Sequence, residues 1–134
     1  MLRLLLIAAS WFSPSGGMRD CVSYWQHELE LETWTIITRV VGDEELGGRI
    51  LGDIDIDHRS KKAVIRLMRV EDSDLPRRLA RAEQRYTIAH ELMHLRLYVN
   101  NDPNWRNEKV VDTATISVMQ KKGRRQELLA LERE

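Results

Sequence analysis

The stretch RYTIAHELMHL, at residues 85–95, carries the strongest structural signal in the chain. It lies within residues 77–99, which contain no glycine or proline and are rich in alanine, leucine, arginine and glutamate, so a long helix is predicted there. On a helix, His90 and His94 share one face with Cβ atoms about 5–6 Å apart, so both imidazoles can bind one zinc ion. Glu91 is offset around the helix and can reach a water molecule without taking a ligand position. The stretch therefore predicts a metal centre with a general base beside it.

A catalytic zinc site needs a third protein ligand, and the segment after this helix offers one. The residues NNDPN, at 100–104, break the first helix and let the chain reverse. Glu108 falls in the first turn of the helix that follows and is the predicted third ligand, with His58 and Asp102 as the alternatives. Asp112 lies one turn further along the same face, where it can accept the second ring N–H of a ligating histidine.

The pattern HExxH followed by Asn-Glu-x-x-x-Asp at residues 107–112 resembles the gluzincins, the glutamate branch of the zinc metallopeptidases. Residues 85–95 are also similar to the RFTLAHELxHL segment of ImmA/IrrE-type proteases, small intracellular enzymes of phages and mobile elements that cleave repressors. The resemblance implies a minimal, phage-type zincin fold and a zinc-dependent peptidase acting on a peptide or protein. It also implies roles for five residues, namely the Zn²⁺ ligands His90, His94 and Glu108, the general base Glu91, and the histidine partner Asp112.

Upstream of the motif, the sequence predicts one helix and three strands. Residues 18–32 alternate apolar and charged faces at helical spacing, and residues 33–41 (TWTIITRVV) are rich in the β-branched and aromatic residues typical of a strand. Residues 50–57 and 63–67 alternate apolar and polar positions around a polar turn, which predicts a hairpin. The order of elements predicts an α+β domain with a short antiparallel or mixed three-stranded sheet. We expect the hairpin at residues 50–70 to provide an edge strand that binds substrate by strand addition.

The length of 134 residues predicts a single domain, which we place at residues 18–122. Residues 1–17 are predicted to be a loose leader or a mis-assigned start, because their apolar run is shorter than the roughly 18–20 residues of a membrane span. We expect a cytoplasmic protein, with export through that leader as the alternative. The single cysteine, Cys21, excludes an internal disulfide and is predicted to be a small buried residue.

The C-terminal part of the chain is predicted to be helical and charged. The helix that carries Glu108 is predicted to begin at Trp105 or Arg106 and to end at Gln120. Lys121-Lys122-Gly123 is its predicted stop, because cations and glycine suit a helix C-terminus. Residues 123–134 are predicted to form a charged helical tail.

The balance of 21 basic and 21 acidic residues gives a formal net charge of zero, which removes the electrostatic footprint of a general nucleic-acid binder. Neither a nucleic acid nor a membrane is an expected partner. The predicted function is a zinc-dependent peptidase in which Glu91 is the general base for the attacking water. The alternative is a non-catalytic zinc-binding protein of zincin fold, acting as a regulatory or assembly factor of a phage or mobile element. Glu91 favours the enzyme, since a purely structural zinc site needs no base.

Three further sets of residues have predicted roles. A side chain that donates to the developing oxyanion is expected among Tyr98, Tyr86 and His58, and the sequence does not choose between them. The predicted core anchors are Trp25, Trp34 and Trp105. The aspartates predicted to form the solvated face of a strand are Asp53, Asp55 and Asp57.

Overall fold

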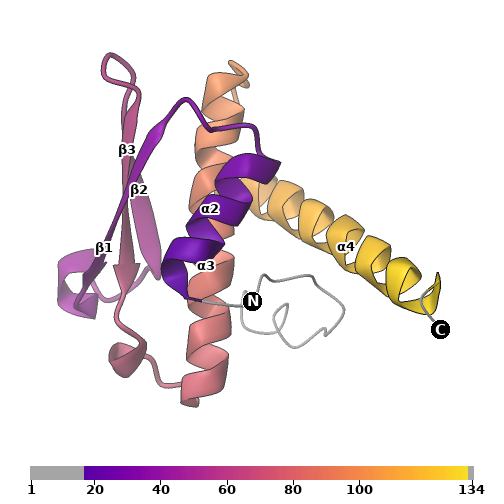
Figure 1. Ribbon diagram of the computed structural model, residues 1–134. Coiled ribbons are helices and arrows are strands. Elements are labelled where there is room, and N and C mark those ends of the chain that lie inside the picture. Colours follow the sequence, from indigo (N-terminus) through magenta and orange to yellow (C-terminus); the bar gives the residue numbers. More distant parts are fainter. Residues whose placement is uncertain (1–16, 133–134) are drawn as a thin grey trace.

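The computed structural model describes the backbone of residues 17–132 and the side chains of residues 17–122. Apart from Gly17, the predicted leader lies outside the described residues. The described elements are α-helices, β-strands and two short 3-10 turns, which confirms the predicted α+β class (Figure 1). In chain order they are α2 (Met18–Glu28), β1 (Thr35–Val41), η1 (Asp43–Leu46), β2 (Gly52–Asp57), β3 (Lys62–Met68), η2 (Val70–Asp72), α3 (Arg77–Val99) and α4 (Glu108–Glu132).

The three strands form a mixed sheet with the order β1-β3-β2. The central strand β3 pairs parallel with β1 and antiparallel with β2, so the predicted hairpin is confirmed. On one face of β3, Ala63, Ile65 and Leu67 are each 0% exposed, as the period-two pattern predicts. Because β2 pairs only with β3, its other edge is free in the described part of the chain.

Helix α3 lies along the buried face of the sheet, with α2 and α4 against its other sides (Figure 1). This central position buries every residue from Tyr86 to Leu95. The polar members of the buried segment are Thr87, His90, Glu91 and His94. Buried polar groups cost free energy unless they find partners, so this cluster marks the part of α3 where a function is to be sought.

The start of β2 packs tightly against α3 at Gly52. A Cβ atom at this position would lie 2.6 Å from the backbone oxygen of Arg66 and 2.8 Å from Cγ2 of Thr87. Real Cβ atoms do not approach other heavy atoms so closely, and only glycine fits without movement. The contact fixes the distance between β2 and the first half of the buried segment of α3.

The reversal between α3 and α4 is held by side chains of the predicted break. Asn101 adopts a positive φ of 58°, and Oδ1 of Asp102 accepts from the backbone N–H of Asn104 at 2.8 Å. Oδ1 of Asn107 accepts from the backbone N–H groups of the second and third residues of α4, at 3.1 and 3.2 Å. Asn107 is therefore the N-cap, and α4 begins at Glu108 rather than at residue 105 or 106 as the sequence predicted.

The N-terminal elements are shorter than predicted. Helix α2 ends at Glu28 instead of residue 32, and β1 begins at Thr35 instead of residue 33. Between them, the side chain of Gln26 donates to the carbonyl oxygens of Leu31 and Trp34, at 3.0 and 2.7 Å, and stabilises a compact turn. Three residues predicted to be buried are confirmed as core: Cys21, Trp25 and Trp34.

The predicted stop of the second helix at residues 121–123 is wrong, because α4 continues through Gly123 to Glu132. One glycine costs a helix only about 1 kcal/mol relative to alanine, and strong helix formers flank this one on both sides. The boundary predicted between the domain and its tail thus falls inside one helix, which projects away from the sheet (Figure 1). Among the described helices, none combines the length and the apolar composition that a membrane span needs.

Candidate metal centre

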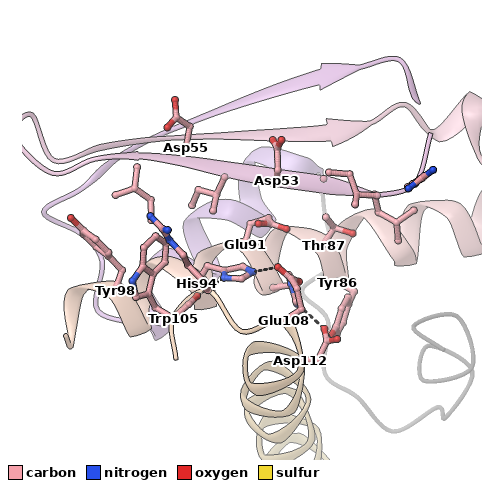
Figure 2. Close-up of a pocket in the computed structure, with 18 residues that line it drawn as sticks. Asp53, Asp55, Tyr86, Thr87, Glu91, His94, Tyr98, Trp105, Glu108 and Asp112 are labelled. Carbon is pink, nitrogen blue, oxygen red and sulfur yellow. Dashed lines mark hydrogen bonds and ion pairs between the residues drawn. The ribbon is translucent and has the colours of Figure 1, made fainter. Parts of the chain in front are cut away.

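His90 and His94 project from α3 toward a single carboxylate, that of Glu108 at the start of α4. Figure 2 shows His94 and Glu108 facing each other. Nε2 of His90 lies 2.8 Å from Oε2 of Glu108, and Nε2 of His94 lies 3.0 Å from Oε1. The two imidazole rings are 4.9 Å apart between centroids. The residues predicted as ligands from sequence spacing therefore meet at one point, from two different helices.

The second nitrogen of each imidazole faces an oxygen. Nδ1 of His94 lies 2.6 Å from the backbone carbonyl oxygen of Trp105. Nδ1 of His90 lies 2.8 Å from Oδ1 of Asp112, although off the line of a good hydrogen bond. The hydroxyl of Tyr86 donates to the same Asp112 oxygen at 2.9 Å. These contacts fix both rings with Nε2 toward the shared carboxylate, the arrangement expected around a metal-bound histidine.

The acceptor atoms at this point need positive charge between them, from protons or from a metal ion. A carbonyl oxygen only accepts, so Nδ1 of His94 is the donor, and Nε2 of a neutral ring then presents a lone pair to Glu108. His90 lies between two carboxylates, those of Glu108 and Asp112. Acceptors at such distances repel unless protons or a metal ion supply positive charge between them.

The donor set and its spacing suit zinc. Ligand atoms about 2.0–2.2 Å from a tetrahedral zinc ion lie about 3.4 Å from one another. The contacts of 2.8 and 3.0 Å between Glu108 and the two rings would open by only about 0.5 Å to admit the ion. Two imidazole nitrogens and one carboxylate, with a fourth position facing a cavity, are a common ligand set of catalytic zinc sites. His90, His94 and Glu108 would hold the metal.

Glu91 lies beside the proposed ligands without duplicating Glu108. Potential ligand atoms of His90, Glu91 and His94 lie within 4.8 Å of one another. In the described residues, however, the short contacts to both rings come from Glu108, and Glu91 makes none of them. Glu91 also lines the cavity, which leaves its carboxyl group accessible to a water molecule there.

In the metal-free protein, the surroundings of Glu91 favour the neutral form of its carboxyl group. The residue is 5% exposed, and burial, followed by the nearby negative charges of Glu108, Asp53 and Asp112, raises its pKa from 4.5 to about 8. A general base works best when its pKa lies near the working pH. The environment therefore moves Glu91 toward the range in which a carboxylate can both take up and release a proton.

A cavity of about 750 Å³ opens onto these residues. Its walls are residues 49–56, the inner face of α3, and the chain reversal before α4. The side chains of consecutive strand residues point to opposite faces of a sheet. All of residues 52–56 nevertheless line the cavity. The wall of the cavity here is therefore the backbone edge of β2. Asp53 and Asp55 agree with this, since their side chains point away from the metal centre in Figure 2. The free edge of β2 thus faces the site.

Two of the three candidate oxyanion donors do not suit that role. Tyr86 is 1% exposed and its hydroxyl donates to Asp112, the carboxylate beside Nδ1 of His90. His58 is exposed on the hairpin turn and is not among the residues that line the cavity. Tyr98 lines the cavity and stays a candidate. The two alternative third ligands lie elsewhere. His58 is outside the cavity lining, and the carboxylate of Asp102 accepts from the backbone N–H of Asn104 in the chain reversal.

Several residues have roles that the sequence did not predict. Trp105, predicted as a core anchor, is half-buried and lines the cavity, and its carbonyl oxygen orients His94. Arg106 also lines the cavity. Of the three aspartates predicted to be solvated, Asp53 is half-buried and paired with Arg66, whose Nε donates to Oδ1 at 2.9 Å. For Trp105 and Arg106, the only sequence signal that could have indicated these roles is their closeness to Glu108.

The described site therefore combines two oriented imidazoles, a carboxylate that bridges them, and a buried acid at the edge of a cavity. A free strand edge runs along the same cavity. The chain matches no known family model, no curated protein and no solved structure.

Proposed function

We propose that the chain is a zinc-dependent peptidase of gluzincin type. One observation carries the proposal, namely that the Nε2 atoms of His90 and His94 meet the carboxylate of Glu108 while Glu91 lies beside them in the cavity wall. A structural zinc site closes its coordination with protein ligands, whereas this one faces a cavity and has an acid next to it. The resemblance of residues 85–112 to gluzincins and to ImmA/IrrE-type proteases agrees with the same chemistry.

His90, His94 and Glu108 would hold a zinc ion, which would supply Lewis-acid chemistry by polarising a peptide carbonyl and making a water acidic enough to react near neutral pH. In its ionised form, Glu91 takes a proton from the attacking water as the new C–O bond forms. It then delivers that proton to the amide nitrogen as the C–N bond breaks. The products are a carboxylic acid and an amine, and Glu91 returns to its starting state.

The substrate would be an extended peptide or protein segment on β2. The free edge of this strand presents unpaired backbone N–H and C=O groups to the cavity. An added strand hydrogen bonds to such groups without regard to its side chains, which holds the peptide backbone parallel to the wall. The scissile bond is then placed above Glu91 and the two histidines on α3, which faces β2 across the cavity.

The central experiment measures zinc stoichiometry and peptide hydrolysis for the unmodified chain, Glu91→Gln and Glu71→Gln. We expect one zinc per chain in all three proteins. Peptide hydrolysis, followed by mass spectrometry on a broad library, should be lost only in Glu91→Gln. The exposed Glu71 lies in η2, away from the cavity, and provides the matched control. Zinc binding without hydrolysis by the unmodified chain would favour the non-catalytic zinc protein, and absence of zinc would exclude both functions.

A further inference from the structure

Arg106 is held on the wall of the cavity by a stack of aromatic rings. Its guanidinium carbon lies 4.6 Å from the centre of the Trp105 ring system. Trp105 in turn meets Tyr98 edge-on, with 5.0 Å between ring centroids. A guanidinium over an indole is stabilised through the ring face, while its N–H groups stay free at the edge. The stack therefore positions a cation beside the metal centre before any substrate arrives.

This cation has no acidic partner in the described structure. Arg66 is paired with Asp53 on the sheet, and Arg69 is paired with Asp72 in the turn that follows β3. Arg106, by contrast, forms no ion pair with any described residue, although it lies in a cavity that also contains carboxylates. Three of those carboxylates belong to the proposed metal centre, and the side chains of the other two, Asp53 and Asp55, point away from it in Figure 2. The guanidinium of Arg106 is therefore left for a group that enters the cavity.

The stack of Arg106, Trp105 and Tyr98 lies at one end of β2, the strand on which the peptide would bind. Tyr98 lies 6.0 Å, between ring centroids, from His58, the residue that directly follows β2. The opposite end of β2 packs on Thr87 through Gly52. Figure 2 shows the same order, with Tyr98 and Trp105 at one end of the cavity and Thr87 at the other. Arg106 is therefore at the C-terminal end of β2, and the metal centre lies between the two ends.

Antiparallel pairing is the more stable way to add a strand to β2. A peptide bound antiparallel has its N-terminal residues at the C-terminal end of β2, close to Arg106. A carboxylate is the group that a guanidinium edge binds best, through two parallel hydrogen bonds. We propose that Arg106 binds an acidic side chain on the N-terminal side of the scissile bond, so that the substrates are acidic peptides. This inference rests on the proposed peptidase function.

The first test compares peptides that differ only in having Glu, Gln or Lys on the N-terminal side of the cleaved bond. The unmodified chain should cleave the Glu peptide about tenfold faster than the Gln peptide, measured as kcat/KM. Arg106→Glu should reverse the order and prefer Lys. Arg39→Glu makes the same change of charge on the exposed part of β1, outside the cavity, and should keep the original preference.

The second test measures binding without hydrolysis, by fluorescence polarisation of the same labelled peptides on zinc-supplemented Glu91→Gln protein. The Glu peptide should bind about tenfold tighter than the Lys peptide, and adding Arg106→Glu should reverse this. Reversal of binding without any hydrolysis by the unmodified chain would support the acidic-peptide site and reject the peptidase. Hydrolysis with no acidic preference, or the same effect from Arg106→Glu and Arg39→Glu, would keep the peptidase and overturn the role of Arg106. If the peptides are neither bound nor hydrolysed, both the peptidase function and the role of Arg106 are overturned.

Discussion

Nδ1 of His94 donates to the backbone carbonyl oxygen of Trp105, with 2.6 Å between the two atoms. Because the acceptor belongs to the main chain, a substitution of the Trp105 side chain does not remove it. The orientation of the imidazole depends instead on the conformation of the reversal between α3 and α4. The same reversal ends at the Asn107 cap and places Glu108. The short connection between α3 and α4 thus orients His94 on one helix and positions Glu108 on the other.

Glu108→Ala should weaken zinc binding by about tenfold or more, because it removes the carboxylate that meets both histidines. Zinc affinity would be measured by competition with a chromophoric chelator. Lys109→Ala, an exposed neighbour in the same turn, provides the control and should bind zinc normally. An unchanged affinity in Glu108→Ala would move the third ligand to another residue.

Asp112→Asn should lower zinc affinity by about 10–100-fold, since it removes the negative charge 2.8 Å from Nδ1 of His90. Tyr86→Phe removes only the hydroxyl that donates to Asp112 and should lower affinity less than Asp112→Asn does. Thr113→Ala, at the exposed next position of α4, is the control. If Asp112→Asn folds and binds zinc as tightly as the unmodified chain, the carboxylate does not support the ligand.

Metal-free Glu91→Gln should become more stable than the metal-free unmodified chain as pH rises. Folding raises the pKa of Glu91 from 4.5 to about 8, so the folded state holds this proton more tightly than the unfolded state. Stability from the protonated carboxyl is complete below pH 4.5 and is lost as pH approaches 8. At about 1.36 kcal/mol per pKa unit, the loss is on the order of 4 kcal/mol.

Thermal unfolding in the presence of a chelator, at intervals from pH 4.5 to pH 8, would test this dependence. The melting temperature of Glu91→Gln should exceed that of the unmodified chain increasingly across the range. Glu71→Gln, in an exposed turn, should show a constant difference. A constant difference for Glu91→Gln as well would mean that its carboxyl group ionises as freely in the folded protein as in water.

Gly52→Ala should destabilise the chain by about 1–3 kcal/mol, because the new methyl group would overlap Thr87 and the backbone oxygen of Arg66. Urea unfolding gives the free energy. Combining it with Thr87→Ser removes the overlapping Cγ2 atom and should recover part of the loss, relative to Thr87→Ser alone. Equal losses in the two backgrounds would show that Thr87 is not the obstacle.

The sequence predicted that His90, His94 and Glu108 would lie together, because the signals that bring them together are close in the chain. The spacing of His90 and His94 and the position of Glu108 after a strong helix break were sufficient to place all three. Helix boundaries were less predictable, because they depend on competition between nearby signals. The side chain of Asn107 caps α4 in preference to earlier positions, and Gly123 sits inside the helix because its neighbours favour helix strongly.

The role of Trp105 could not be read from its pattern. An aromatic residue beside a helix start is most often buried in a core, and only the fold turns this one toward the cavity. Tyr86 was one of three candidate oxyanion donors, and its position one turn before His90 brings its hydroxyl to Asp112. Both outcomes depend on the angle between α3 and α4, which is a tertiary property.

Glu108, the proposed ligand, is the first residue of the long helix α4. The helix runs without interruption from Glu108 to Glu132, and the ion pair between Lys122 and Glu28 attaches it to α2. Glu108 lies about 21 Å along the axis from Lys122, so a tilt of about 5° around this attachment would move the carboxylate by about 2 Å. Coordination distances tolerate only about 0.2 Å. A force on the projecting arm of α4 that tilts the helix would therefore change the distances between Glu108 and the two histidines.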